Sequence, residues 1–232
     1  GRWSRGLGDV YKRQVSDPAG IEQRYINVDK PGANPSWLGN PGLRDPIRTT
    51  LRGALSRGIA RVELFGSRIW DYPYLTRVEA GGAPYETYAG IGALLAGVDA
   101  TVDWTHAVGR LTWNWGEKTA DQGALAEIQP LAVGVTVRTS RDDPARLWLH
   151  GEITARQDRV DASLQETTTA GWNRWDLGVD LEGDHWVGSV VVANLFNELY
   201  AQHLSYLRNP FAAGVKVHEP GRTLQVTAAF RY

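Results

Sequence analysis

Apolar and polar residues alternate with a period of two in seven stretches of this 232-residue chain. Successive side chains of a strand point to opposite faces, so each stretch reads as a strand with one apolar and one polar face. No stretch carries the helical stripe of an amphipathic helix. The pattern predicts an all-β chain, and the apolar residues that we expect to share one face include Ile47, Leu51, Val98, Val102, Leu131, Val135, Leu147, Leu177, Val179, Leu224 and Val226.

The connections between these stretches are alternately short and long. Short turn sequences lie near residues 57, 107, 142 and 183, and longer connections occupy residues 73–87, 117–127, 157–170 and 205–220. This alternation is typical of an antiparallel meander in a transmembrane β-barrel, with tight turns at one end and long loops at the other. We expect about nine strands, over residues 46–57, 59–72, 88–105, 109–117, 128–140, 145–157, 171–182, 185–200 and 221–232.

A soluble β-sandwich also has alternating strands, and three features favour the barrel over it. Several stretches are long enough to cross a bilayer obliquely. Aromatic residues near the strand ends suit interfacial girdles, as do Trp104, Trp113, Trp115, Trp175, Phe230 and Tyr232. The polar face is densely charged, as a wet lumen would be, with Arg48, Arg52, Arg61, Glu63, Asp99, Asp103, Arg138, Glu152, Arg156, Asp176 and Asp180.

Composition narrows the function classes. Lys and Arg total 25 and Asp and Glu total 26, so a net charge of −1 gives no electrostatic basis for binding nucleic acid. Cysteine is absent, which excludes disulfides and thiolate metal sites. Methionine is absent too, so we expect a mature product or a fragment. No nucleophile elbow, P-loop or dinucleotide fingerprint is present, and we predict neither catalytic residues nor a cofactor.

The five histidines do not have the close spacing of a metal pair, and we predict no metal site. Solvated turns and polar lumen lining account for most of them. The last long loop is the one place where imidazoles could converge on a ligand. Its candidate ligand-binding residues are His203, Tyr206, Arg208 and His218.

The C-terminal third resembles the end of TonB-dependent outer-membrane receptors. In that family the penultimate strand carries an Asn-Leu-Phe-Asp-like motif and then a Tyr, and the last strand opens with Pro-Gly-Arg and ends on an aromatic residue. The matching positions here, which the resemblance ties to barrel assembly, are Asn194, Leu195, Phe196, Tyr200, Pro220, Gly221, Arg222, Phe230 and Tyr232. Asn197 stands where the family usually has Asp.

Further motifs resemble the same family. Asn40-Pro41-Gly42-Leu43 is similar to its Asn-Pro-x-Leu loop motif. The segments 155–160 and 219–222 look most like the copper-receptor branch, although the absence of Met, a common copper ligand, weighs against copper.

The resemblance implies that the chain is the C-terminal part of a 22-stranded barrel in the cell outer membrane. Its implied function is active uptake of a metal, a metal chelate or another scarce nutrient, without enzymatic chemistry. The implied partners are the lipid bilayer, the metal or metal-chelate ligand, and a periplasmic energy-transducing protein that acts through an N-terminal region outside this chain. The barrel-assembly machinery would recognise the C-terminal strand.

Three segments are expected along the chain. Residues 1–14 do not fit the barrel pattern and look like a non-native leader, with an ordinary loop or half-strand as the alternative. Residues 15–45 are expected to form an irregular extracellular loop, and residues 46–232 the barrel part.

Two other functions stay open at this point: a small complete outer-membrane barrel, acting as a porin or an enzyme, and a soluble sandwich acting as a binding module. The ends of the sheet distinguish them. A wall segment should leave strands 46–57 and 221–232 each without a partner on one side, whereas a complete barrel should pair these two strands with each other.

Overall fold

The computed structural model describes residues 9–16, 20–28, 36–80, 82–140, 143–205 and 215–230. Within these ranges the chain is almost entirely β-structure, with one short α-helix, α1 (Ile21–Tyr25), and one 3-10 turn over Ala162–Leu164. The strands are β1 (Asp9–Ser16), β2 (Asn27–Val28), β3 (Ser36–Leu38), β4 (Ile47–Arg57), β5 (Ala60–Ala80), β6 (Ala83–Trp104), β7 (Ala107–Lys118), β8 (Ala132–Arg138), β9 (Ala145–Thr154), β10 (Trp172–Gly183), β11 (Trp186–Ala193) and β12 (Thr223–Phe230).

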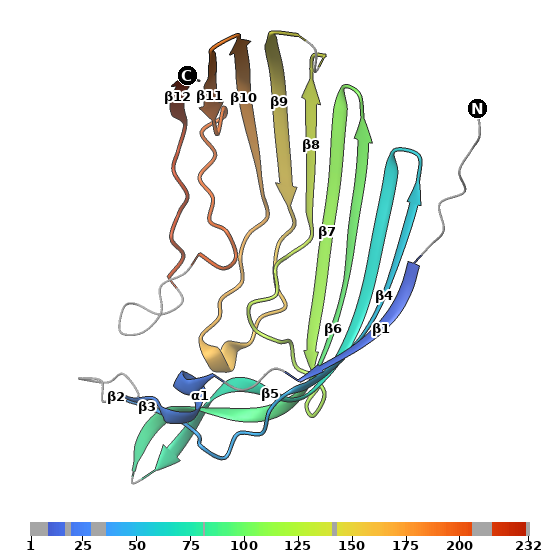
Figure 1. Cartoon of the computed structure of the whole chain (residues 1–232). Coiled ribbons are helices and arrows are strands. Elements are labelled where there is room, and N and C mark those ends of the chain that lie inside the picture. Colours follow the sequence, from blue (N-terminus) through green and yellow to red (C-terminus); the bar gives the residue numbers. More distant parts are fainter. Residues whose placement is uncertain are drawn as a thin grey trace.

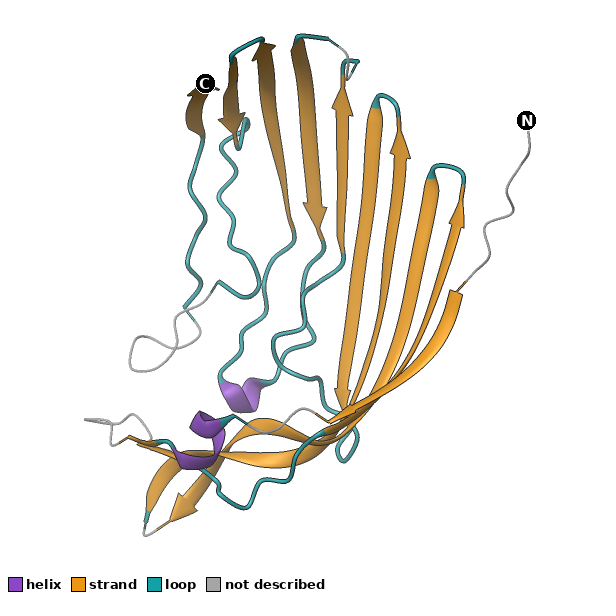
Figure 2. Ribbon diagram, in the orientation of Figure 1, coloured by secondary structure: helices purple, strands orange, loops and turns teal. Residues whose placement is uncertain are grey.

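The nine predicted strands are present as β4 to β12, and they pair in sequence order. Each is antiparallel to its chain neighbours, which confirms the predicted meander. The sheet curves strongly, with the short turns together at one end and the long connections at the other (Figures 1 and 2). No helix among the described residues is long and apolar enough to cross a bilayer.

The apolar side chains predicted to share a face do so in the observed register. Leu55, Val62, Ala100, Leu111, Val133 and Ile153 lie opposite one another in a row that runs from β4 to β9. Side chains at directly paired positions point to the same side of a sheet, so this row identifies one continuous apolar face. None of the predicted residues is buried, and Leu51 and Val226 are 58% and 70% exposed. The expectation of an exposed apolar face is therefore confirmed; we call it the convex face.

Aromatic residues mark two levels on the convex face. Trp104, Trp186 and Phe230 lie beside the short turns, and Trp70 and Trp113 lie toward the long loops. Trp104 is paired with Ala107, and Trp115 follows Ala107 by eight residues. This separates the two levels by about 20 Å across a sheet of tilted strands, close to the height of the apolar band of outer-membrane barrels.

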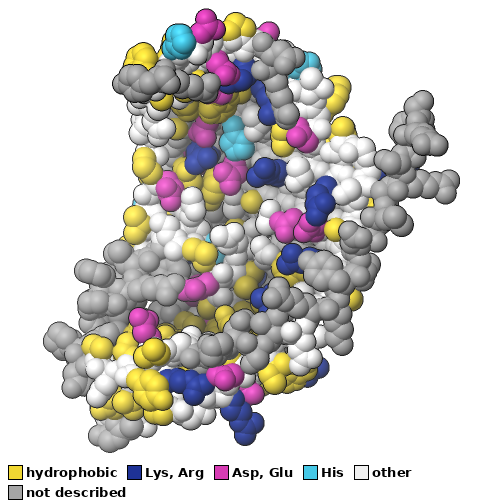
Figure 3. All heavy atoms as spheres, in the orientation of Figure 1, with side chains coloured by type: hydrophobic (Ala, Val, Ile, Leu, Met, Phe, Trp, Pro, Cys, Tyr) yellow, Lys and Arg dark blue, Asp and Glu magenta, His cyan; other side chains and the backbone are white. Residues whose placement is uncertain are grey.

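The opposite, concave face carries the charged residues as mixed ion pairs (Figure 3). Arg138 lies 3.3 Å from Asp103, and Arg146 lies 3.2 Å from Glu182. Each pair joins side chains from different strands, so positive and negative charges are interleaved across the face. Because both signs are present and partly exposed, this face is suited to water rather than to lipid.

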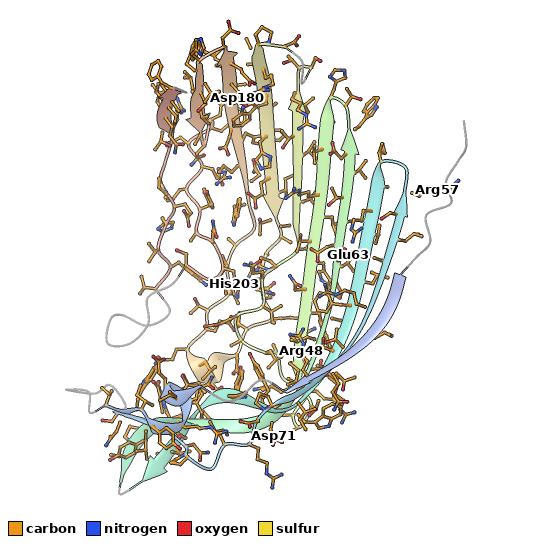
Figure 4. All side chains as sticks on the ribbon, in the orientation of Figure 1. Arg48, Arg57, Glu63, Asp71, Asp180 and His203 are labelled. Carbon is orange, nitrogen blue, oxygen red and sulfur yellow. The ribbon has the colours of Figure 1, made fainter. Side chains whose placement is uncertain are left out.

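Two predicted boundaries are wrong at the long-loop end of β5 and β6. Residues 73–87 were expected to be a loop, but β5 runs to Ala80 and β6 begins at Ala83, so the hairpin continues beyond the wall. The register slips between Ile69 and Tyr72, and Asp71 has φ of 54°. An extra residue in one strand exchanges the two faces, so a period-two pattern read across this bulge is interrupted. Asp71 lies where β5 bends away in Figure 4.

The segment 15–45, expected to be irregular, contains short regular elements. Helix α1 is followed by β2 and β3, and β3 pairs in parallel with β6 through Ser36 and Tyr85. These elements lie beside the extended β5–β6 hairpin (Figure 1). The extended hairpin offers an unpaired strand edge, and pairing with that edge orders part of the predicted loop.

The sheet is open, as expected for part of a larger wall. Among the described residues β12 pairs only with β11, and no pairing closes it onto β4. The expectation that β4 lacks an upstream partner is wrong, because β1 pairs with it from Asp9↔Ala54 to Ser16↔Ile47. Backbone groups of an edge strand pair with any extended segment whatever its side-chain pattern, which is why alternation did not reveal β1. The leader assignment of residues 1–14 stays a prediction.

Reversing the polarity of the convex face provides a test of this orientation. We expect Val135→Arg to lower the free energy of unfolding in phospholipid vesicles by about 2–4 kcal/mol, because a charge would face acyl chains. Ser189→Arg is the matched control, since Ser189 lies opposite Asp180 on the concave face, and we expect a change within about 1 kcal/mol. Urea titration of the complete gene product measures both, and equal losses would contradict the assignment of faces.

Candidate functional site

The C-terminal motif forms a turn centred on Asn194, rather than a continuation of β11. Asn194 is 2% exposed and has φ of 52°. Its side chain accepts a hydrogen bond from the Glu198 N–H at 2.8 Å and donates to the Glu198 carbonyl at 2.9 Å and the Pro220 carbonyl at 3.3 Å. Its own N–H donates to Asp176 Oδ1 at 2.8 Å. Asn194 therefore joins the end of β11 to β10 through its backbone, and to the segment that leads into β12 through its side chain.

Asn197 connects the same turn to the segment before β12. Its φ is 56°, and its Oδ1 accepts a hydrogen bond from the Arg222 N–H at 2.9 Å, at the start of β12. Asn and Asp tolerate this left-handed backbone better than other side chains. The Pro220-Gly221-Arg222 segment, which is exposed, thus meets the Asn-Leu-Phe-Asn segment directly.

The predicted strand 185–200 is too long for the same reason, because β11 ends at Ala193. A residue with positive φ cannot continue a strand, and the side-chain bonds of Asn194 replace the ladder bonds of β11. The remaining motif residues are divided between exposed and buried positions. Phe196 and Phe230 are 68% and 71% exposed, Leu195 is half-buried, and Tyr232 lies outside the described residues.

Tyr200 anchors the turn against β10. Its ring lies 4.3 Å from that of Trp172, and its hydroxyl accepts a hydrogen bond from Arg174 at 3.1 Å. Arg174 also forms ion pairs with Asp176 at 3.2 Å and Glu152 at 3.6 Å. The aromatic residue of the motif is therefore buried between the last loop and the concave face.

The structure places His203 in a buried polar cluster below the strands, among the long connections (Figure 4). Its Nε2 lies 3.0 Å from Glu166 Oε1, and its Nδ1 lies 2.8 Å from Thr169 Oγ1. A carboxylate only accepts hydrogen bonds, so Nε2 donates to Glu166 and Nδ1 accepts the Thr169 hydroxyl proton when the ring is neutral. Both ring nitrogens are thereby engaged.

A second carboxylate extends this cluster toward the barrel wall. Asp161 accepts hydrogen bonds from the Tyr74 hydroxyl at 2.6 Å and from Lys118 Nζ at 2.9 Å. Its own N–H donates to Glu166 Oε2 at 2.7 Å, and the Glu127 N–H donates to Glu166 Oε1 at 2.8 Å. The cluster joins β5, β7 and the three long connections that follow β7, β9 and β11.

Hydrogen bonding outweighs burial at both carboxylates. Burial alone would raise the pKa of Glu166, but His203 and the N–H groups of Asp161 and Glu127 hold the pKa of its carboxyl below the usual 4.5. Burial likewise opposes ionisation of Asp161, while Ser163, Tyr74 and Lys118 hold its pKa below 3.8. Both groups are anions at neutral pH.

The structure describes two of the four predicted ligand-binding residues, His203 and His218. His203 is buried, His218 is exposed beyond the last loop, and Tyr206 and Arg208 lie outside the described residues. Among the described residues no group of three or more His, Cys, Asp or Glu side chains could hold a metal ion. Chemically, the cluster fixes loops in place.

Sequence reasoning missed Glu166, Asp161, Tyr74 and Lys118. Each contacts a partner far away in the sequence. Glu166 lies 37 residues from His203, Lys118 lies 43 residues from Asp161, and Tyr74 lies 87 residues from Asp161. An Asp and a Glu within a connecting loop give no local signal of burial, since charged residues are mostly exposed.

Substitutions in the motif turn separate its two asparagines. We expect Asn194→Ala to lower the free energy of unfolding by about 3 kcal/mol, because it leaves partly buried backbone groups of Glu198 and Pro220 unpaired and puts Ala at positive φ. Asn197→Asp should change it by less than about 0.5 kcal/mol, since a carboxylate oxygen can also accept from Arg222. Chemical unfolding of the complete gene product in detergent micelles measures both, and a larger loss for Asn197→Asp would overturn this account.

The carboxylate cluster predicts a pH dependence. A carboxyl whose pKa is depressed by folding stabilises the fold above its unfolded value, and this stabilisation is lost as pH falls through the folded value. We therefore expect protection of the Glu127 and Asp161 amides to be full at neutral pH and to decline below about pH 4.5. Glu166→Gln should flatten this decline, and hydrogen exchange measured across pH checks it. The neutral-pH protection of Glu198 amide, which Asn194 binds, serves as the internal control.

Comparison with known proteins shows what this arrangement resembles. No protein-family profile and no curated protein sequence matches the chain. Solved structures do match. The copper transporter OprC has a TM-score of 0.78 at 17% identity, over 98% of this chain and 37% of the transporter.

Two iron receptors match in the same way. The ferric-catecholate import receptor Fiu from E. coli K12 has a TM-score of 0.64 at 14% identity, over 95% of this chain and 32% of the receptor. A mutant of the ferric enterobactin receptor PfeA from Pseudomonas aeruginosa, bound to enterobactin, has a TM-score of 0.67 at 16% identity, over 97% and 38%.

This chain thus spans about a third of the length of the structures that it matches. These neighbours are TonB-dependent receptors, and the shared part is their strand meander. The chain has the fold of part of the barrel wall of TonB-dependent receptors, as its C-terminal motifs implied.

Proposed function

We propose that this chain is the C-terminal part of the barrel of an outer-membrane receptor that takes up a metal, a metal chelate or another scarce nutrient by active transport. The observation that carries the proposal is the open sheet, which has an apolar convex face, a charged concave face and edges that do not meet. A sheet edge in hydrocarbon leaves backbone groups unpaired at several kcal/mol each, so further strands must complete the wall.

The other two candidate functions are less well supported. A small complete barrel would pair β12 with the opposite edge of the sheet, which is β1 beside β4, and in the described residues β12 pairs only with β11. A soluble sandwich would bury its apolar face against a second sheet, whereas Leu55, Leu64 and Leu224 are each more than half exposed. We therefore place the convex face against lipid, and the chain in the outer membrane.

We propose that the long loops capture the ligand. The neighbours named above are a copper transporter and receptors for ferric catecholate and ferric enterobactin, and we propose a ligand of the metal or metal-chelate class for this chain. His203 would position the last loop through Glu166 and Thr169. His218, together with Tyr206 and Arg208, would contact the ligand directly.

The partners follow from the same proposal. A periplasmic energy-transducing protein would act through a region outside this chain and drive uptake. The barrel-assembly machinery would recognise the C-terminal strand, whose Phe230 lies opposite Trp186 beside the short turns. Neither partner requires chemistry from the barrel, and we assign no enzymatic activity to it.

Recovery of the complete gene tests the proposal. We expect a signal peptide and a plug-like domain to precede this chain. We further expect cells that express the complete protein to accumulate a labelled ferric chelate or copper only when the energy-transducing protein is present. Uptake that persists without that protein would indicate a porin, and a signal peptide directly before residue 20 would indicate a small barrel.

His218→Ala then tests the ligand loop. Loss of a direct ligand contact is expected to weaken ligand binding by about tenfold, the effect of one charged or metal contact. His185→Ala is the matched control, because His185 lies in a short turn at the opposite end of the sheet. Equilibrium binding to the purified complete protein measures both variants, and equal affinities would remove His218 from the site.

A further inference from the structure

The barrel wall has a gap between β7 and β9. β8 pairs with β7 only from Ala107 to Thr112, while β7 continues to Lys118. Beyond Thr112 β8 no longer pairs with β7. Residues 123–125 pair instead with residues 116–118, and a cavity of about 260 Å³ lies beside residues 113–116. Its lining includes Trp113, Trp115, Leu131, Arg156 and Arg159.

The cavity lining joins the two sides of the wall. Trp113 and Trp115 come from the convex face at the aromatic level near the long loops, and Leu125 belongs to the small buried cluster on the other side. Trp113 and Trp115 are paired with Val98 and Ala96, which belong to the apolar side of β6. The exposed apolar residues Leu131 and Ile153 continue from the cavity toward the short turns. One end of the cavity therefore meets the apolar band, and the other end meets the loops.

Two arginines, Arg156 and Arg159, stand at the loop side of the cavity. Arg156 was expected on the polar face of a strand, but β9 ends at Thr154, so the alternation no longer assigns its face. Arg159 lies over the Trp115 ring at 5.0 Å and donates through one terminal nitrogen to the Gly116 carbonyl at 3.3 Å, which also accepts the Leu125 N–H at 3.2 Å. The same nitrogen lies 3.5 Å from Glu117. Arg156 bonds to Asp158 through Nε at 2.5 Å.

Most of the guanidinium donors are still available. Among the described residues, the second terminal nitrogen of Arg159 and both terminal nitrogens of Arg156 have no recorded hydrogen bond. The side chains of Arg156 and Arg159 are 65% and 47% exposed, and exposed ion pairs of this kind are weak. A doubly charged anion with several acceptor oxygens can therefore replace Asp158 and Glu117 as the partner.

We propose that this cavity binds the phosphate group of a membrane lipid whose acyl chains lie along the convex face. The inference rests on the membrane location proposed above. Two forked guanidinium groups match the oxygens of a phosphate, and the aromatic walls match the boundary between headgroup and acyl chains. The adjoining Leu131 and Ile153 favour a lipid over a free anion, because acyl chains can pack against these apolar side chains and a free anion cannot.

Native mass spectrometry of the complete protein in non-ionic detergent tests the proposal. The probe is diphosphoryl lipid A, compared with its dephosphorylated form and with inorganic phosphate. We expect one tightly retained diphosphoryl lipid, and the double variant Arg156→Gln/Arg159→Gln should weaken its binding at least about tenfold. Arg61→Gln is the matched control, since Arg61 is also paired with a carboxylate, Glu63, but lies on the concave face.

Three results would overturn the proposal: unchanged affinity in the double variant, equal binding of the dephosphorylated lipid, or displacement of the lipid by millimolar inorganic phosphate. Heat-modifiable electrophoretic mobility shows that each variant is folded. If the double variant fails this check, Arg156→Gln alone gives the test, because Arg156 makes no recorded backbone contact. Uptake of the labelled ligand, measured in parallel, separates the lipid-site proposal from the proposal of active transport. Lipid retention without uptake would contradict active transport and would still support the lipid site.

Discussion

The backbone hydrogen-bond ladder is the constraint on which the rest of this structure depends. A strand in hydrocarbon has no water to satisfy its N–H and C=O groups, so every strand needs a neighbour on both sides. From β4 to β12 the antiparallel pairing is unbroken along the sheet. Once pairing fixes the register, period two assigns each side chain to a face, and the apolar and charged faces follow from the sequence. The stability of such a wall therefore resides in pairing between neighbours rather than in a central core.

Where the ladder ends, buried polar side chains replace it. The apolar core of the described residues is small, comprising Ile69, Tyr74, Ala93 and Leu125 at the long-loop end. Beside it, Asp161 and Glu166 collect hydrogen bonds from several loops. A satisfied carboxylate can accept more hydrogen bonds than any neutral side chain, which suits it to joining segments that have no ladder of their own. Asn194 does the same for the turn between β11 and β12.

The strands and their faces were predictable because alternation is a local property, and the nine predicted strands are all present. The errors occur where the backbone departs from a regular strand. Asp71 and Asn194 both have positive φ, and each ends or shifts a pattern that the apolar residues alone would continue. The pairing of β1 with β4 was not predictable, since an open edge accepts a partner through its backbone. The role of His203 was not predictable either, because Glu166 lies 37 residues away in the sequence.

The gap between β7 and β9 follows from the same constraint. β8 pairs with β7 only from Ala132 onward. The end of β7 is bound instead by residues 123–125 and by Arg159, and the Gly116 carbonyl accepts from both the Leu125 N–H and Arg159. A guanidinium that satisfies one carbonyl keeps further donors, whereas a strand would have used its groups within the ladder. The change of partner along β7 thus places solvent-exposed arginine donors beside aromatic and aliphatic side chains of the convex face. That combination occurs because the wall is interrupted, and it is the reason that a phosphorylated lipid, rather than another strand, fits there.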